Sequence, residues 1–440
     1  MLFFKKEFLG KHFLNRTVRF SAIFLYIFLF SFFVLLISGA GEAVAQSIDS
    51  KKVEAAQGST IYLSQAQFIE KEGKDGKMHP VPGPARLVIL TRTKSGWMEE
   101  AVEDPDSNVF HKAAWFVPSS GEPGILTIGA TGAFLKIWRK KGGKWKSEVL
   151  WHPSFGGKFD RLRDFEITDI TGDGIKDIVV ATHDQGVIAV VSQEDGKWKA
   201  EELCRNKDTF VHEIETGDVD GDKIIEIFAT PSKPNKLDGS IQPGSIEMWK
   251  FVNGNRERRV VESFESRHVK EILCIPIKGE ENPVLFASLE GEHFGRIDEG
   301  DTTRIRMYRF DKEKISYTDI ANLPGKLCRF LTFGDTDGDG VRELIASTRV
   351  SGIWRLTPPL KDIFKNEWKK TLIEKDSSGF EHATYLYDFN GDGIEEIYVA
   401  SDDQKEIRCY WFNGRDYSVD VLKGFNNDVI TFNLTANMIN

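Results

Sequence analysis

The stretch Asp335-Thr-Asp-Gly-Asp-Gly-Val-Arg-Glu343 decides how this sequence is interpreted. It places carboxylates at its first, third, fifth and ninth positions and a glycine at its sixth. The same nine-residue pattern begins three more times without gaps, at Asp169, Asp218 and Asp388. Each copy leads into a short apolar run that ends in a small residue, such as 344–347. Because the pattern recurs in register, it indicates a repeated structural unit.

The repeated unit extends beyond the acidic loop. After each apolar run come another apolar strand, a turn and a further strand, and Asn253-Gly254 and Asn413-Gly414 are typical hairpin turns. Three more units keep the strands and lose the acids, so that seven units start at residues 116, 169, 218, 275, 335, 388 and 433. Four short strands in each unit predict an all-β fold, a seven-bladed β-propeller of four-stranded antiparallel blades. A β-sandwich followed by a second β domain is the alternative, and the shared register of the units argues against it.

The two ends of the chain are expected to build one blade together. The last unit, around residues 428–433, provides only a first strand. Near the N-terminus, residues 61–64, 86–91 and the segment from Trp97 onward have the pattern of a second, third and fourth strand without a first. We therefore predict that the C-terminal strand closes the first blade, which removes exposed sheet edges.

Residues 1–45 have the pattern of an export signal. Basic residues such as Lys5 and Arg19 precede the apolar run Phe20–Ile37, and Ala43-Val-Ala45 matches the pattern that signal peptidase recognises. The apolar run is also long enough to remain as an N-terminal membrane anchor. In both cases residues 46–440, expected to be a single propeller domain, lie outside the cytoplasm. The protein is thus predicted to be secreted, periplasmic or at the cell surface, with membrane contact only through an uncleaved N-terminal segment.

The composition excludes several classes of protein. The 440 residues include 58 basic and 67 acidic side chains, for a net charge of −9. An acidic chain without a basic block in its mature part is not expected to bind nucleic acid. Its four cysteines contain no Cys-x-x-Cys pair, which excludes a disulfide scaffold, a zinc ribbon and thioredoxin-type chemistry.

The acidic loops have the ligand chemistry of a Ca²⁺ site. Hard oxygen ligands at alternate positions around a tight turn suit Ca²⁺, whereas zinc and copper prefer imidazole or thiolate. An EF-hand is excluded because the twelfth position of each loop is apolar and lies in a predicted strand. The loop at Asp335 has the full acidic set and the glycine; in the loop at Asp169, Thr171 departs at position three, and in the loop at Asp218, Lys223 replaces the glycine at position six. The predicted metal ligands are Asp169, Thr171, Asp173 and Asp177; Asp218, Asp220, Asp222 and Glu226; Asp335, Asp337, Asp339 and Glu343; and Asp388, Asn390, Asp392 and Glu396.

This combination of loops and strands resembles the FG-GAP repeat, also described as the VCBS repeat, of secreted bacterial proteins and of the integrin α-subunit N-terminal propeller. The resemblance covers residues 57–435 and is most specific in the four loops. It implies a propeller with calcium on its bottom face and ligand contacts on its top face. It does not imply one activity, because the family includes adhesion modules, lectin-like domains and polysaccharide lyases.

A ligand is expected at the end of the first strands that lies opposite the metal loops. Six positions before the loop starts, the four units with acids carry Arg163, His212, Arg329 and His382, our predicted ligand-binding residues. Near the equivalent positions of the two degenerate units are His111, His268 and Lys270. Gathered around one axis, these groups would attract an anionic ligand. Alternatively, they pair with acids such as Asp164, Glu213 and Glu381 and only pack the interior.

The function predicted from the sequence is that of an exported calcium-binding module. Its partner would be a carbohydrate polymer or an extracellular protein, with the long segments 65–84, 231–244 and 289–303 as further contact sites. His293, Asp298 and Glu299 lie in the last of these segments. No Gly-x-Ser-x-Gly or His-Glu-x-x-His motif is present, and no catalytic residue is assigned. The alternative is a polysaccharide lyase that uses the His and Arg residues of the top face.

Overall fold

The structure, a computed structural model, describes residues 55–157, 159–234, 242–252, 255–291, 302–311, 314–364 and 367–438. The predicted export segment, residues 1–45, lies outside these ranges, as do His293, Asp298 and Glu299. Within them the chain forms strands β1 to β29. None of the described segments is a helix with the length and apolar character of a membrane span.

The chain divides into two compact units. One contains residues 68–82, and the other contains residues 53–67 and 83–440. In the first, the end of β1 (Ser59–Glu72) and β2 (Met78–Pro82) form an antiparallel hairpin with Phe68 opposite Pro82. Most of the segment 65–84, which the sequence analysis treated as a long loop, is therefore a β-hairpin.

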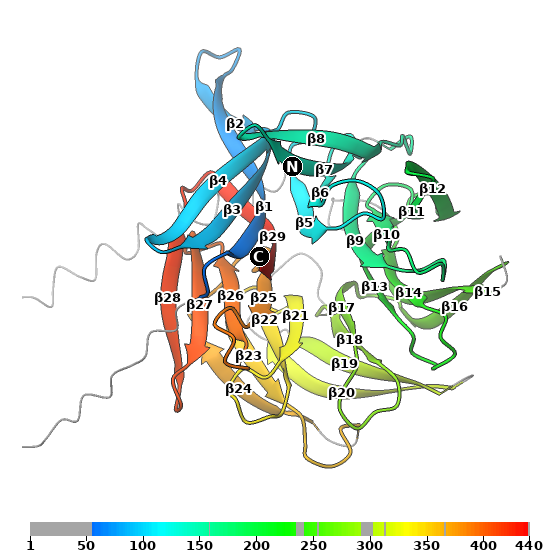
Figure 1. Cartoon of the computed structure of the whole chain (residues 1–440). Helices are drawn as coiled ribbons and strands as arrows, with labels where there is room; N and C mark the ends of the chain where they lie inside the picture. The colour runs from blue at the N-terminus through cyan, green and yellow to red at the C-terminus, as the bar shows by residue number, and fades with distance from the viewer. Residues whose placement is uncertain are drawn as a thin grey trace, which may run out of the picture. The chain divides into compact units, whose positions relative to one another are not determined.

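The larger unit consists of seven antiparallel sheets around one axis (Figure 1). Every sheet is one blade of four consecutive strands, apart from the blade that both chain ends build. In order from the first strand to the fourth, the blades are β29 (Val429–Met438), β1, β3 (Ala85–Thr93) and β4 (Gly96–Asp104); β5 (Phe110–Phe116), β6 (Gly124–Gly129), β7 (Leu135–Lys141) and β8 (Lys144–Trp151); β9 (Leu162–Thr168), β10 (Asp177–Thr182), β11 (Ile188–Glu194) and β12 (Lys197–Cys204); β13 (Phe210–Gly217), β14 (Glu226–Ser232), β15 (Gly244–Val252) and β16 (Asn255–Phe264); β17 (Val269–Ile275), β18 (Val284–Leu289), β19 (Thr302–Asp311) and β20 (Lys314–Pro324); β21 (Cys328–Gly334), β22 (Glu343–Thr348), β23 (Ile353–Thr357) and β24 (Lys369–Glu374); and β25 (Thr384–Tyr387), β26 (Glu396–Ser401), β27 (Glu406–Phe412) and β28 (Tyr417–Gly424).

The first strands form a closed series around the axis. β5, β9, β13, β17, β21, β25 and β29 each contact the next, and β29 contacts β5. This arrangement confirms the predicted all-β, seven-bladed propeller. The hydrophobic core lies between neighbouring blades: Leu126 and Ile137 of one blade pack with Phe165 and Val180 of the next. Because second strands such as β10 are buried along their whole length, their sequences are continuously apolar instead of alternating.

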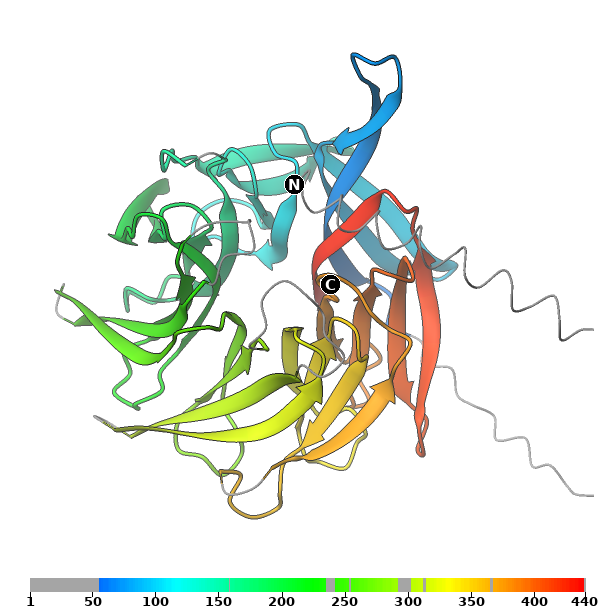
Figure 2. The ribbon, with the colours of Figure 1, turned by 180° about the vertical axis from the view of Figure 1, so that it is seen from behind.

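The C-terminal strand closes the first blade, as the sequence predicted. β29 pairs antiparallel with β1 from Ser59 opposite Met438 to Gln67 opposite Val429. Figure 2 shows the red β29 beside the blue β1. Leu434 is buried and packs in one cluster with Ile61 of its own blade and Tyr398 of the preceding blade. The two ends of the propeller are thus held together by both backbone hydrogen bonds and core packing.

Candidate functional site

The four acidic loops share one turn that their own side chains hold. In the loop 335–343, between β21 and β22, Asp335 accepts hydrogen bonds from the backbone N of Gly338 at 2.7 Å and of Gly340 at 2.9 Å. Asp339 Oδ1 accepts one from the backbone N of Val341 at 2.8 Å. The loops that start at residues 169, 218 and 388 repeat all three bonds. Hydrogen bonds within the nine residues therefore hold the backbone conformation of each loop.

The loop 218–226 keeps this turn although a lysine stands where glycine is expected. Lys223 has a φ of 71°, and its backbone N donates to Asp218 Oδ2 at 2.9 Å, as the glycines of the other loops do. A side chain at positive φ is unfavourable. The carboxylate of Asp218 thus holds a residue in a conformation that it would otherwise avoid.

Carboxylates gather in three of the four loops. Three ligand atoms lie within 4.8 Å of one another in each of these groups: Asp218, Asp220 and Glu226; Asp335, Asp337 and Asp339; and Asp388, Asp392 and Glu396. In the described loop 169–177 no such group forms. There Asp177 Oδ2 accepts hydrogen bonds from the backbone N of Ile170 and from the backbone N and Oγ1 of Thr171, at 3.1–3.2 Å. The carboxylates of Asp169, Asp173 and Asp177 are therefore not gathered as in the other three loops, and Asp177 bonds to Ile170 and Thr171 instead.

The residues of loop 335–343 fit a bound cation. Glu343 is fully buried, and its Oε1 and the Oδ1 of Asp337 are buried atoms that take part in no hydrogen bond. Arg355 on β23 contacts Asp337, and its Nη1 lies 3.7 Å from Glu343 Oε1. Burial and the neighbouring charge of Asp337 raise the pKa of Glu343 to about 7. An unpaired buried carboxylate oxygen is costly, and a metal ion would remove that cost.

The loop 388–396 also fits, with one amide among its ligands. Asn390 donates from Nδ2 to Glu396 Oε1 at 2.7 Å and accepts at Oδ1 from the backbone N of Asp392 at 2.8 Å. Burial and the charges of Asp388 and Asp392 raise the pKa of Glu396 to about 7. Among the described residues, no ion pair engages these three carboxylates. This loop concentrates negative charge without a protein cation beside it.

In the loop 218–226 a lysine lies among the predicted metal ligands. Lys250 Nζ lies 2.7 Å from Asp220 Oδ2, 2.7 Å from Asp222 Oδ2 and 2.6 Å from Glu226 Oε1. The carboxylates predicted to bind a metal here therefore already surround a cation. Sequence reasoning missed Lys250 because it lies on β15, outside the loop. The available signal was a lysine at the end of the strand Ser245-Ile-Glu-Met-Trp-Lys250.

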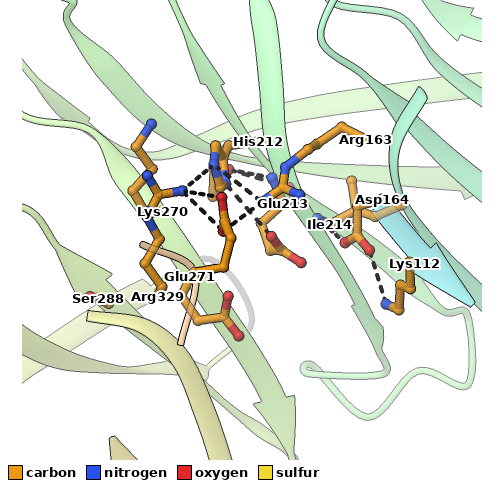
Figure 3. Close-up of polar contacts among 12 residues, drawn as sticks. Lys112, Arg163, Asp164, His212, Glu213, Ile214, Lys270, Glu271, Ser288 and Arg329 are labelled. Atoms are coloured by element: carbon orange, nitrogen blue, oxygen red, sulfur yellow. Dashed lines mark hydrogen bonds and ion pairs between the residues drawn. The ribbon is translucent and has the colours of Figure 1, made fainter. Parts of the chain in front are cut away.

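At the other end of the first strands, three of the four predicted ligand-binding residues meet. Arg163 Nη2 and Arg329 Nη1 both lie 3.3 Å from His212 Nε2 (Figure 3). Glu381 contacts Arg329 at 3.3 Å and Arg163 at 3.8 Å. Lys270 of β17 lies beside Arg329 (Figure 3). We refer to Arg163, His212, Lys270, Arg329 and Glu381 as the axial cluster.

Burial determines the charges of the axial cluster. Burial and then the charges of Arg163, Lys270 and Arg329 lower the pKa of His212 well below its usual value. Burial and these neighbouring positive charges therefore disfavour the cationic form of His212. Burial also lowers the pKa of Lys270 to about 8, against the opposing charge of Glu290 at 3.9 Å. The lasting positive charge of this cluster resides on its two arginines.

Several of the first strands that carry the axial cluster also carry acidic side chains at the next positions (Figure 3). Lys112 Nζ lies 2.9 Å from Asp164 Oδ1 and 2.7 Å from Glu166 Oε1. Burial raises the pKa of Glu213 and of Glu271 well above the usual range. The alternative that the sequence left open was that the basic residues of the first strands pair with neighbouring acids. Such ion pairs are present in the structure.

His382 does not join the axial cluster. It is fully buried, donates from Nδ1 to the carbonyl of Thr348 at 2.7 Å, and lies with Nε2 2.7 Å from Ser377 Oγ. The expectation that all four residues surround one axis is therefore wrong at this position. The reason is local: β25 begins only at Thr384, and His382 has a φ of 55°, so the strand register does not extend to it. Its neighbour Glu381 contacts the arginines instead.

Comparisons with known proteins agree with this fold. A family model described as an FG-GAP-like repeat matches residues 169–229. No curated protein sequence matches the chain. Similar solved structures include a hypothetical selenium-binding protein from Sulfolobus tokodaii, with a TM-score of 0.52 and 11% identity over 87% of this chain and 93% of that chain. Another is a putative 6-phosphogluconolactonase from Bacteroides fragilis, with a TM-score of 0.47 and 13% identity over 86% of this chain and 98% of that chain. At such identities the likeness concerns the fold alone.

Proposed function

We propose that this chain, a β-propeller whose residues 169–229 match an FG-GAP-like repeat, is an exported binding module that holds Ca²⁺ in the loops 335–343 and 388–396. The observation that carries this proposal is the pair of buried oxygens, Asp337 Oδ1 and Glu343 Oε1, that take part in no hydrogen bond. Only oxygen donors are available in these loops, and such a donor set suits a hard divalent cation. The residues that would hold the ions are Asp335, Asp337, Asp339 and Glu343, and Asp388, Asn390, Asp392 and Glu396.

Calcium would have a structural role in this module. Each of the two loops joins a first strand to a fully buried second strand, β22 or β26. An ion that binds only the folded protein raises its stability by about 2.7 kcal/mol per site at 100 times the dissociation constant. We therefore expect the melting temperature to rise by several degrees between EGTA and millimolar Ca²⁺, and to rise less with Mg²⁺ at the same concentration. Coincident melting curves in EGTA and Ca²⁺ would reject the metal assignment.

We propose that the partner presents an anionic group to the axial cluster, on a carbohydrate polymer or an extracellular protein. The Nε atoms of Arg163 and Arg329 are buried and without a hydrogen-bond partner. Three cations, counting Lys270, face only Glu381 and Glu290 among the ion pairs of the described residues. A carboxylate or sulfate could satisfy the free guanidinium donors.

The geometry favours binding over the lyase alternative. A lyase needs a base that is free to take a proton from its substrate. His212 Nε2 already lies between two guanidinium groups, at 3.3 Å from each. We therefore expect no unsaturated uronate product, followed by its ultraviolet absorbance, when the protein is incubated with polyuronates.

Binding can be tested with polygalacturonate as the anionic probe and dextran as the neutral control. The double substitution Arg163→Gln and Arg329→Gln should weaken polygalacturonate binding at least tenfold, while Glu381→Gln should strengthen it by removing the competing carboxylate. The melting temperature of each variant shows whether the fold is retained. If the folded double variant binds as well as the wild type, the anion site lies elsewhere.

Export is the remaining part of the proposal. It rests on the basic residues, the apolar run and the pattern Ala43-Val-Ala45 at the start of the chain. N-terminal sequencing of the protein from the extracytoplasmic fraction should begin at Gln46. Retention of residues 1–45 in a membrane fraction would indicate an anchor, and a cytoplasmic location would contradict export.

A further inference from the structure

We propose that the ammonium group of Lys250 permanently takes the place of a metal ion in the loop 218–226, so that this blade is stabilised by a cation of its own chain instead of by Ca²⁺. The inference concerns a loop that the proposed function leaves out, and it does not depend on calcium binding elsewhere. It rests on the contacts of Lys250, on its burial and on the register of the neighbouring strands.

The contacts match the bonding capacity of an ammonium group. A protonated lysine has three N–H donors and no acceptor. Lys250 Nζ has three carboxylate oxygens within 2.7 Å, one each from Asp220, Asp222 and Glu226. Its side chain is only 9% exposed, so water competes little for these bonds. Lys250 therefore forms an ion pair with each of three carboxylates that the acidic pattern places at the centre of the loop.

The register of the blades explains why only this loop has such a cation. Strand pairing places Ile227 opposite Trp249, Leu344 opposite Leu356 and Ile397 opposite Tyr410. The next residue on the third strand then faces position nine of the loop. That residue is Lys250 in one blade, and Thr357 and Trp411 in the other two. In the latter two blades, no lysine can enter the loop from this position.

Arg355, which lies near loop 335–343, does not pair with three carboxylates of its loop as Lys250 does. Arg355 forms its close contact with Asp337 alone and remains 3.7 Å from Glu343 Oε1. Asp337 Oδ1 and Glu343 Oε1 stay without a hydrogen-bond partner. In loop 218–226, by contrast, an incoming Ca²⁺ would have to share three carboxylates with a cation within 3 Å of each. Mutual repulsion between a divalent ion and an ammonium group at such separations opposes joint occupancy.

The proposal is tested on the full chain with Lys250→Met, which removes the charge and keeps a side chain of similar length. The matched control is Lys199→Met, because Lys199 is a largely exposed lysine that pairs with one carboxylate, Glu194. Melting curves in EGTA and in Ca²⁺, and Ca²⁺ titration by calorimetry, are recorded for the wild type and both variants.

We expect Lys250→Met to melt several degrees below the wild type in EGTA, because three carboxylates lose their counter-charge. In Ca²⁺ the variant should recover most of this loss and bind one ion more than the wild type, whereas Lys199→Met should behave as the wild type in both conditions. If Lys250→Met does not fold in EGTA, refolding on addition of Ca²⁺, followed by circular dichroism, gives the same information. A variant without an added Ca²⁺ response, or with unchanged stability in EGTA, would overturn the proposal. If Ca²⁺ changes the melting temperature of Lys250→Met but not that of the wild type, the proposed function is rejected and this inference stands.

Discussion

The two ends of the propeller's first strands are built in different ways. At one end, each acidic loop is a run of nine consecutive residues whose backbone is held by its own side chains. At the other end, the axial cluster takes one residue from each of five successive blades, so that Arg163 and Arg329 share Glu381 only because the blades surround one axis. The difference teaches that local sequence determines the loops, whereas global closure determines the cluster.

The electrostatic consequences also differ. The fifth-position aspartate of each acidic loop is exposed to water, where salt and ions screen its charge. The axial cluster is nearly closed to solvent: Arg163, His212 and Arg329 are each at most 8% exposed. Charges in such a place interact strongly and are expensive to leave unpaired. Changes at the axial end should therefore cost more than changes at the loop end.

Opening the ring should have the largest effect. Deletion of residues 425–440 removes β29, which pairs with β1 and contributes the buried Leu434 to the core. Two sheet edges would then be exposed. We expect loss of soluble, folded protein, measured by size-exclusion chromatography and limited proteolysis. A monomeric truncation that melts like the wild type would show that closure is not needed for the fold.

Unpairing the axial arginines should have the next largest effect. Glu381→Ala leaves Arg163 and Arg329 without their shared carboxylate, and breaking a buried ion pair costs about 3–5 kcal/mol. Denaturant unfolding of this variant is compared with Glu122→Ala, whose side chain is largely exposed and lies 3.8 Å from Lys141. The control should lie within about 0.5 kcal/mol of the wild type. An equal effect of the two changes would mean that the axial contacts contribute no net stability.

Acid should destabilise the fold through the buried side chain of His382. Burial lowers the pKa of His382 to about 4, below its value in the unfolded chain, so the unfolded chain binds the proton more readily. Stability is then fully present above about pH 6.5 and falls by about 3 kcal/mol as the pH drops to 4. His382→Gln should reduce this acid-dependent loss by a similar amount, although its stability at pH 7 will also change. An unaltered slope of stability against pH would contradict the assignment.

The sequence was sufficient for every feature that depends on a repeated pattern. The blades, the turn of each acidic loop and the joint first blade all follow from the register of strands and acids. It was insufficient where a side chain arrives from another strand. Lys250 reaches its loop across the blade, and Glu381 replaces His382 because the chain departs from strand geometry just before β25. Such contacts depend on packing and local φ, which the spacing of residue types does not encode.

The smallest expected effect is a difference between two acidic loops in how much Ca²⁺ stabilises the protein. Asp392 and Asp173 both occupy position five, and each accepts a hydrogen bond at Oδ1 from the backbone N of position seven, at 2.9 Å and 2.8 Å. An asparagine keeps that acceptor and removes only the charge, so both substitutions preserve the turn. Asp392→Asn should weaken the loop 388–396 as a metal site and reduce the stabilisation gained on adding Ca²⁺ by up to about 2.7 kcal/mol at 100 times the dissociation constant. Asp173→Asn should leave that gain unchanged within about 0.5 kcal/mol, since its loop gathers no carboxylate group. Stability in EGTA and in Ca²⁺, measured for both variants by denaturant unfolding, gives the two gains; equal losses would show that these two loops bind calcium alike, although no carboxylate group gathers in the loop 169–177.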